Sequence, residues 1–455
     1  MDLTVPMESC IRETLRVTLR FRLAFVAGFL TWTVSGCNEF QPQAPLPYAS
    51  DKATSAKLAD KPKVQARVSQ LVSQLFGPNT EELRVPPGAP LPEAGARIAS
   101  QVLLAEGDST KPGPVIHEAG KPDTPIRGGL GLYREHCMHC HGASGDGNGP
   151  TALFLWPRPR DFRTGVYKFT STEGTGVDSK PTRQDLKRTL LDGIDNSSMS
   201  SFAAVLTPSE IDQVLDYIVF LSLRGEVETT LATLGQDVSE DDAETDLSED
   251  VAQEAIDLVF GRWTNAAERV IAPPSARPEA TPESIERGKQ LYLGAKGLQC
   301  FGCHGLDGKG NGESFVDYRS FVRAVFQGNP SQDKIDELKD FAEKNSKKWA
   351  DDWGQPLRPA NLQAGRFKGG RRPIDLYWRV AKGINGTPMP AHFSSSGGSL
   401  LTSDEVWDVV NFVLALPSEK SLLEGAKAVE LAPSTDTANN LPSAGSPDPS
   451  QQPAS

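Results

Sequence analysis

The sequence predicts a helical protein built on two related blocks, at about residues 125–224 and 280–418. Each block contains one Cys-x-x-Cys-His motif, at Cys137–His141 in the first block and at Cys300–His304 in the second. Each block also opens with Gly-x-x-x-Tyr and closes with apolar residues that recur at helical spacing. The same motifs in the same order indicate an internal repeat.

Residues 1–36 have the pattern of a secretory signal peptide. Several arginines precede an apolar stretch, Leu23–Val34, that is short for a membrane span. The following Val34-Ser35-Gly36-Cys37 resembles the lipobox of bacterial lipoproteins, in which the cysteine is acylated. We therefore expect an extracytoplasmic protein on the periplasmic face, anchored to a membrane by a lipid on Cys37. An uncleaved anchor helix and a plain secreted protein are the alternatives.

Three segments outside the two blocks predict little folded structure. Residues 37–124 are rich in Pro, Ala and Gly, which predicts a tether with one helix at Val64–Phe76. Residues 225–279 include an acidic run, the usual composition of a solvated linker, and continue into a helix at Val251–Val270. Residues 419–455 have a Ser, Pro, Asn and Ala composition that predicts a disordered tail.

Charge and cysteine content restrict the partners and the compartment. A formal net charge of −12 argues against nucleic acid, whose phosphates require a basic surface, and suits a partner with a basic docking patch. Of the six cysteines, Cys10 lies in the signal peptide, Cys37 is the candidate lipid site, and the other four belong to the two motifs. No pair is left for a structural disulfide.

Cys-x-x-Cys-His is the attachment signature of c-type haem, so two copies predict two haems. The paired thiols can add across haem vinyl groups, and the histidine is placed to bind the iron. The residues assigned in this way are Cys137, Cys140, Cys300 and Cys303 as thioether donors, and His141 and His304 as iron ligands. A zinc or dithiol site is disfavoured, because a histidine directly after the second cysteine is not zinc spacing.

Two loops follow the motif in both blocks. The first is glycine-rich, at His141–Gly149 and His304–Gly312, and predicts a tight turn with positive φ angles. The second begins with Arg-Pro, at Arg158 and at Arg358. We expect this second loop to line one edge of the haem.

Each block closes with a helix that starts with a capping box, Thr207–Glu210 or Thr402–Glu405. Apolar residues follow at helical spacing, so we expect these helices to pack on the opening ones. Tyr217 and Trp407 are interpreted as core aromatic residues at that crossing and not as electron relays, because packing is the commoner role of buried aromatics.

A hexacoordinate haem also needs an iron ligand on its distal side, and thioether sulfur suits iron. Besides the methionines of the signal peptide and Met138, which lies between two anchoring cysteines, the sequence contains Met199 and Met389. Each lies six residues after the glycine of a Gly-Ile step, one per block. The alternative role for either methionine is packing in the hydrophobic core. This alternative weighs more for Met199, because its loop lacks the prolines that stiffen the loop around Met389. The competing histidines are His117, His136, His139 and His392.

Taken in order, these motifs resemble tandem class I cytochrome c domains. The resemblance implies an all-α fold of two cytochrome c-like helical domains that carry two haem c groups. The axial pairs that it implies are His141 with Met199, and His304 with Met389. Arg158 and Arg358 look like the positions whose side chains neutralise a haem propionate, and a plain surface arginine is the alternative.

The second block departs from the resemblance by an insertion at about residues 313–355, which is rich in aromatic and charged residues. A helix is predicted within it near Asp333–Lys348. Loops longer than about fifteen residues usually have a use. Our hypothesis is that the insertion docks a partner or caps the space between the haems.

The function expected from these observations is one-electron transfer between extracytoplasmic or membrane redox partners. Such partners include an oxidase, a dehydrogenase or another cytochrome, and the chain could serve as the haem subunit of a respiratory complex. The alternative is a dihaem peroxidase with one displaceable axial ligand, for which Met199 is the candidate. No catalytic residue is predicted.

Overall fold

The computed structural model describes residues 46–80, 82–98, 115–116, 124–125, 128–315, 331–333, 336, 340, 348–351, 353–394 and 397–429. The predicted signal peptide, Cys37, His117, most of the insertion and the end of the tail lie outside these residues. Within the described residues, no helix combines the length and the apolar character that crossing a membrane requires.

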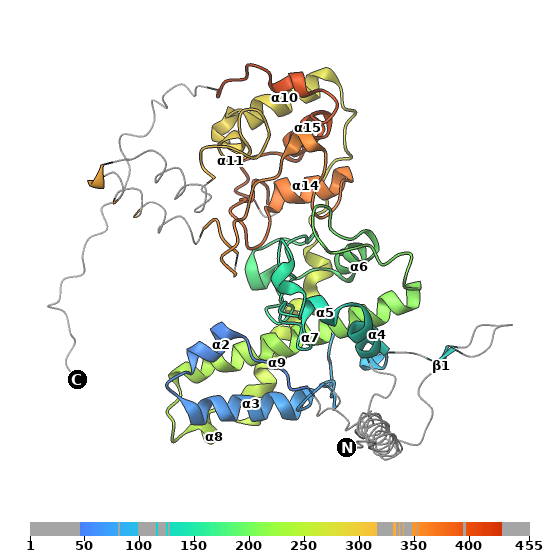
Figure 1. Cartoon of the computed structure of the whole chain (residues 1–455), viewed down its shortest axis with the longest axis vertical. Helices are drawn as coiled ribbons and strands as arrows, with labels where there is room; N and C mark the ends of the chain where they lie inside the picture. Colours follow the sequence, from blue (N-terminus) through green and yellow to red (C-terminus); the bar gives the residue numbers. More distant parts are fainter. Residues whose placement is uncertain are drawn as a thin grey trace, which may run out of the picture. The chain divides into compact units, whose positions relative to one another are not determined.

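The described part of the chain is helical, which confirms the predicted all-α class (Figure 1). The α-helices are α2 (Lys52–Lys57), α3 (Pro62–Phe76), α4 (Gly128–His136), α5 (Met138–His141), α6 (Arg183–Asp192), α7 (Pro208–Leu234), α8 (Ala243–Asp246), α9 (Glu249–Thr264), α10 (Pro282–Tyr292), α11 (Cys300–His304), α14 (Pro373–Lys382) and α15 (Ser403–Ala415). The short 3₁₀ helices are η1 (Pro92–Gly95), η2 (Ala152–Phe154), η3 (Gly176–Asp178), η4 (Gly235–Asp237), η5 (Asn265–Arg269), η6 (Ala295–Gly297), η7 (Leu362–Ala364) and η8 (Lys420–Leu423). Strands β1 (Val115–Ile116) and β2 (Thr124–Pro125) form one short antiparallel pair.

In the first block, α4 packs closely across α7 at Gly129. A Cβ atom at Gly129 would lie 2.1 Å from the carbonyl oxygen of Gln213, so glycine is needed for this approach. One turn further along α4, Tyr133 packs edge-on against Tyr217, with ring centroids 5.0 Å apart. Both rings are fully buried, which confirms Tyr217 as a core residue at the crossing.

The second block repeats this crossing with α10 and α15. A Cβ atom at Gly288 would lie 2.1 Å from the carbonyl oxygen of Asp408. Tyr292 packs against Phe412 with ring centroids 5.4 Å apart. Trp407 is buried as predicted, but it packs against Tyr377 of α14 and not at the crossing itself.

The predicted capping boxes start both closing helices. The Thr207 hydroxyl accepts the Glu210 N–H at 3.3 Å, and the Glu210 carboxylate accepts the Thr207 N–H at 2.9 Å. Thr402 and Glu405 make the same two bonds, at 3.3 and 2.9 Å. Each box satisfies backbone donors that the first helical turn leaves unpaired.

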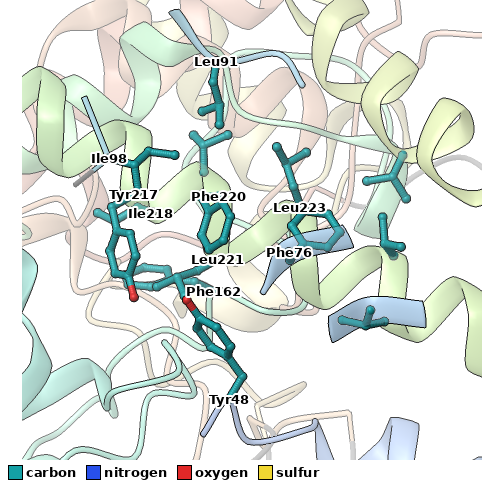
Figure 2. Packing of buried hydrophobic residues seen from close by; sticks show 14 of the residues in the cluster. Tyr48, Phe76, Leu91, Ile98, Phe162, Tyr217, Ile218, Phe220, Leu221 and Leu223 are labelled. Atoms are coloured by element: carbon teal, nitrogen blue, oxygen red, sulfur yellow. The ribbon is translucent and has the colours of Figure 1, made fainter. Parts of the chain in front are cut away.

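Residues 47–98 differ from the expected tether, because they pack against the first block. The predicted helix is present as α3, and its apolar face is buried against α7. Figure 2 shows Phe76 of α3 beside Phe220 of α7, with ring centroids 5.8 Å apart. The Pro, Ala and Gly composition of this segment gave no indication of the packing. The amphipathic pattern of α3 did, because an amphipathic helix needs a surface against which to bury its apolar face. The extension of α7 to Leu234 supplies that surface.

The expected solvated linker is also packed, although the helix predicted in it is present as α9. Glu226 is buried in α7 and accepts hydrogen bonds from Lys180 Nζ and, at 2.7 Å, from Trp263 Nε1 of α9. Asp241, Asp242 and Glu244 are exposed, but the apolar side chains of Ala243 and Leu247 beside them are buried. The acidic run therefore corresponds to an exposed turn within a packed segment and not to a solvated linker.

The chain beyond residue 419 continues as packed structure for several residues. Leu423 in η8 is buried, and the Val429 N–H donates to the carbonyl oxygen of Leu293 at 2.6 Å. The expected disordered tail therefore does not start at residue 419, because apolar side chains such as Leu423 have a core to enter.

Polar side chains join the two blocks. Lys382, at the end of α14, donates to Thr170 Oγ1 and, at 2.9 Å, to Ser179 Oγ in the first block. Asn385 Nδ2 donates to the carbonyl oxygen of Tyr167 at 2.8 Å. Lys382 and Asn385 flank the glycine that begins the Met389 loop, so this contact fixes the start of that loop.

Candidate functional site

The two motif histidines contact equivalent backbone carbonyl groups in the two blocks. His141 Nδ1 lies 3.0 Å from the carbonyl oxygen of Arg160, and His304 Nδ1 lies 3.0 Å from that of Ala360. A carbonyl oxygen only accepts, so Nδ1 carries the proton in both rings. Nε2 is then left as a lone-pair donor, the arrangement found in histidines that bind a metal.

Burial keeps these imidazoles neutral. It lowers the pKa of His141 to about 4 and also lowers the pKa of His304. Phe162 stacks on the His141 ring, with centroids 4.4 Å apart and planes inclined by 16°. Ring orientation, tautomer and charge in the first block all suit a metal ligand.

The four motif cysteines form no disulfide within the part of the chain that the structure describes. Burial raises the pKa of Cys137 to about 12 and that of Cys300 to about 12. Both therefore stay protonated at neutral pH, which is the opposite of the activated thiolate of a dithiol redox site. Each is placed one turn before its motif histidine by a short helix, α5 or α11.

The glycine-rich loops have the predicted positive φ angles, including +77° at Gly142 and +84° at Gly305. A Cβ atom at Gly147 would lie 2.6 Å from the Pro159 carbonyl oxygen, and one at Gly310 would lie 2.5 Å from that of Pro359. Glycine therefore lets this loop pack against the Arg-Pro loop. The Arg-Pro loop in turn supplies the carbonyl group that orients the histidine.

Met199 and Met389 lie in loops of matching geometry. The Ile194 N–H donates to the Met199 carbonyl oxygen at 2.9 Å, and the Ile384 N–H donates to that of Met389 at 3.3 Å. A hydroxyl group braces each loop. Ser197 Oγ donates to the Ile194 carbonyl oxygen at 2.7 Å and accepts the Met199 N–H at 3.2 Å. Thr387 makes the equivalent bonds at 2.8 and 3.3 Å.

Candidate residues of both blocks line one cavity of about 1750 Å³. This volume exceeds the roughly 300–1,000 Å³ of a pocket for one small molecule. The candidate residues that line it are Cys137, Cys140, His141, Arg158, Met199, Cys300, Cys303, His304, Arg358 and Met389. The two sets of ligands therefore face connected space.

Arg158 is a further residue that suits an anionic group in this cavity. Among the described residues, its buried Nε atom has no hydrogen-bond partner, and Nη1 donates to Asn148 Oδ1 at 3.4 Å. A guanidinium with unfilled donors beside a large cavity fits a carboxylate-bearing ligand such as haem. With the thiol, imidazole and thioether groups around it, the cavity fits c-type haem.

Three further histidines of the described residues lie at the cavity without the same support. His136, His139 and His392 line it, and burial lowers the pKa of His392. None of the three is matched by a histidine at the equivalent position of the other block, whereas Met199 and Met389 match each other.

Sequence reasoning missed several residues that shape the site. The carbonyl groups of Arg160 and Ala360 could have been suspected, because each lies two residues after the repeated Arg. Ser197 could also have been found by aligning it with Thr387. Trp353, which lines the cavity from the insertion, had no repeat to identify it.

Comparisons with known proteins agree with this geometry. Residues 285–417 match the family model "Cytochrome c", and residues 124–218 match the family model "Cytochrome C oxidase, cbb3-type, subunit III". No match was found among curated proteins. A solved structure of a reducing HAO-like protein complex from Kuenenia stuttgartiensis is 26% identical, covers 63% of this chain and 94% of that chain, and has a TM-score of 0.39. The two family matches support two c-type cytochrome domains in tandem, which implies haem c as the cofactor.

Proposed function

We propose that this chain is a dihaem c-type cytochrome that carries single electrons between extracytoplasmic or membrane redox partners. The two cytochrome c matches support a c-type cytochrome in electron transfer. The observation that carries the proposal is the repetition, around one cavity, of an oriented neutral histidine and a braced methionine loop.

The proposed haem domains comprise about residues 125–224 and 280–418. Cys137 and Cys140 attach one haem, and Cys300 and Cys303 attach the other. When bound, each haem supplies an iron that gains and loses one electron. The proposed axial pairs are His141 with Met199, and His304 with Met389.

Side chains of this polypeptide would then fill both axial positions at each centre. Such a site leaves no coordination position for a substrate, which favours a carrier over the alternative, a dihaem peroxidase. Arg158 and Arg358 neutralise propionates at the cavity wall in this proposal. Because the candidate residues of both blocks line one cavity, they would hold two haems in connected space, which would suit electron transfer between the haems within the chain.

We also propose that the mature protein is anchored by a lipid on Cys37 at the periplasmic face. Proteins of the c-type cytochrome class are typically extracytoplasmic, and the signal-like N-terminus is consistent with export. The acidic net charge of −12 favours redox partners with a basic docking surface. Membership of a respiratory complex as its haem subunit is one form of this function.

Optical spectra and a redox titration of the Met199→Ala protein test the assignment. We expect the loss of one methionine-to-iron band and a shift of one of two midpoint potentials. Met138→Ala is the matched control, because Met138 lies between the anchoring cysteines and outside the cavity lining. High-spin iron at one centre of the unaltered protein, together with peroxide turnover, would favour the peroxidase.

A further inference from the structure

The end of the insertion in the second block forms a braced turn. The Asp351 carboxylate accepts the N–H groups of Trp353 at 3.0 Å and of Gln355 at 2.8 Å. The Leu357 N–H donates to the Trp349 carbonyl oxygen at 2.7 Å, which closes the base of the turn. The Trp349 ring is buried and packs edge-on against Phe315 at 5.2 Å. These contacts hold Trp353 and Gln355 in place.

This turn contacts Arg158 of the first block. The Arg158 guanidinium carbon lies 4.6 Å from the centroid of the Trp353 ring, a cation–π distance. The Arg158 backbone N–H donates to Gln355 Oε1 at 3.2 Å. All three residues line the shared cavity. Residues of the second block thus contact both the backbone and the guanidinium group of Arg158 at the first site.

The turn lies in a segment that is much longer in the second block than in the first. Between the last glycine of the glycine-rich loop and the Arg-Pro step, the first block has only residues 150–157, whereas the second has residues 313–357. The turn is therefore an addition to the second block that acts on the first.

We propose that Trp353 and Gln355 are positioning residues for the first haem: they hold Arg158 against a propionate of that haem and thereby raise its midpoint potential. A positive charge fixed beside a haem favours the reduced iron, which carries one positive charge fewer. The effect falls on the first centre because Arg158 belongs to the first block. This inference rests on the proposed function, since it requires a haem in the first site.

The test is a redox titration of the full-length, haem-loaded Trp353→Leu protein, with the haem content of each variant measured first. The first centre is identified by its response to Met199→Ala. We expect its midpoint potential to fall, by up to about a tenfold change in the reduction equilibrium, or about 59 mV for one electron. The second midpoint and the spin state should be unchanged. Trp353→Phe keeps an aromatic face, so the first midpoint potential should stay close to that of the unaltered protein.

Two further variants separate positioning from general loosening of the structure. Trp378→Leu is the matched control, because Trp378 also stacks on an arginine of the other block, Arg188 at 5.3 Å, but does not line the cavity. It should leave the first potential unchanged. In an Arg158→Gln background, Trp353→Leu should produce no additional shift, since its effect passes through Arg158.

Gln355→Ala supplies the same test if Trp353→Leu does not fold, and it should lower the first potential in the same way. An unchanged first midpoint would overturn the inference. Equal shifts at both centres, the same shift in Trp378→Leu, or a full shift in the Arg158→Gln background would also overturn it. A chain that carries no haem would instead refute the proposed function.

Discussion

Two hydroxyl groups explain why the methionine loops match despite different sequences. Prolines flank Met389 but not Met199, and the lack of prolines made Met199 the weaker candidate by sequence. Ser197 nevertheless makes the same pair of hydrogen bonds as Thr387. The shape of the loop thus depends on a side chain that accepts one N–H and donates to one carbonyl group, which either residue provides.

Removal of the Ser197 hydroxyl should loosen the Met199 loop alone. Each lost hydrogen bond costs about 0.5–1.5 kcal/mol. Ser197→Ala should therefore weaken one methionine-to-iron band and leave the other intact, as measured by optical spectra during urea titration. Thr387→Ala should do the converse. Ser198→Ala is the control, since Ser198 is exposed. Equal loss of both bands in Ser197→Ala would contradict this account.

Lys382 should make the contact between the blocks sensitive to pH. Burial lowers its pKa from 10.5 to about 8, so the folded chain favours the neutral amine. The contribution of Lys382 to stability is therefore complete above pH 10.5 and is lost as the pH falls through 8. The size of this change is up to about 3 kcal/mol.

Lys382→Met tests this prediction. It leaves the Thr170 and Ser179 hydroxyl groups with a hydrogen-bond partner, because the two bond to each other at 3.0 Å. In urea unfolding, the stability of the unaltered protein relative to Lys382→Met should rise between pH 8 and 10.5. A difference that is constant over this interval would show that the Lys382 amine is not desolvated.

At the scale of elements, the helix crossings were predictable and the surrounding packing was not. Gly129 and Gly288 stand at matching positions of the repeat, so the sequence itself indicated where backbones meet. The packing of α3 on α7, and of α9 through Trp263 on Glu226, joins residues that are distant in sequence. Local composition carries no information on such pairings, so Pro-rich and acidic segments were interpreted as a tether and a linker.

Gly129→Ala should destabilise the first block by about 1–3 kcal/mol or more, because its methyl group would overlap the Gln213 carbonyl oxygen. Gly131→Ala, on the same helix with open space around its Cβ position, should instead stabilise it by about 0.5–1 kcal/mol. Urea unfolding of both variants checks the pair. Similar effects of the two changes would refute the close crossing.

Phe76→Ala should destabilise the first block by about 3–5 kcal/mol, since Phe76 is fully buried against Phe220. Leu258→Ala is the control, because half of the Leu258 side chain is exposed on α9. Thermal unfolding distinguishes the two. A Phe76→Ala protein as stable as the control would restore the view of residues 47–98 as a tether.

At the scale of the whole molecule, the two blocks share one cavity, so each completes the surroundings of the other. The motif residues and both methionines were recognisable because they repeat within the sequence. The sequence did not indicate that the two sites share one cavity. This arrangement depends on contacts between residues that are distant in sequence, such as Lys382 with Thr170 and Trp353 with Arg158.

The most direct test of the account is the electron paramagnetic resonance spectrum of the exported, fully oxidised protein, with the spins counted per chain. The account predicts two low-spin ferric centres per chain, each with histidine and methionine ligation. A chain with no ferric haem signal, or with one high-spin centre in place of a low-spin one, would contradict it.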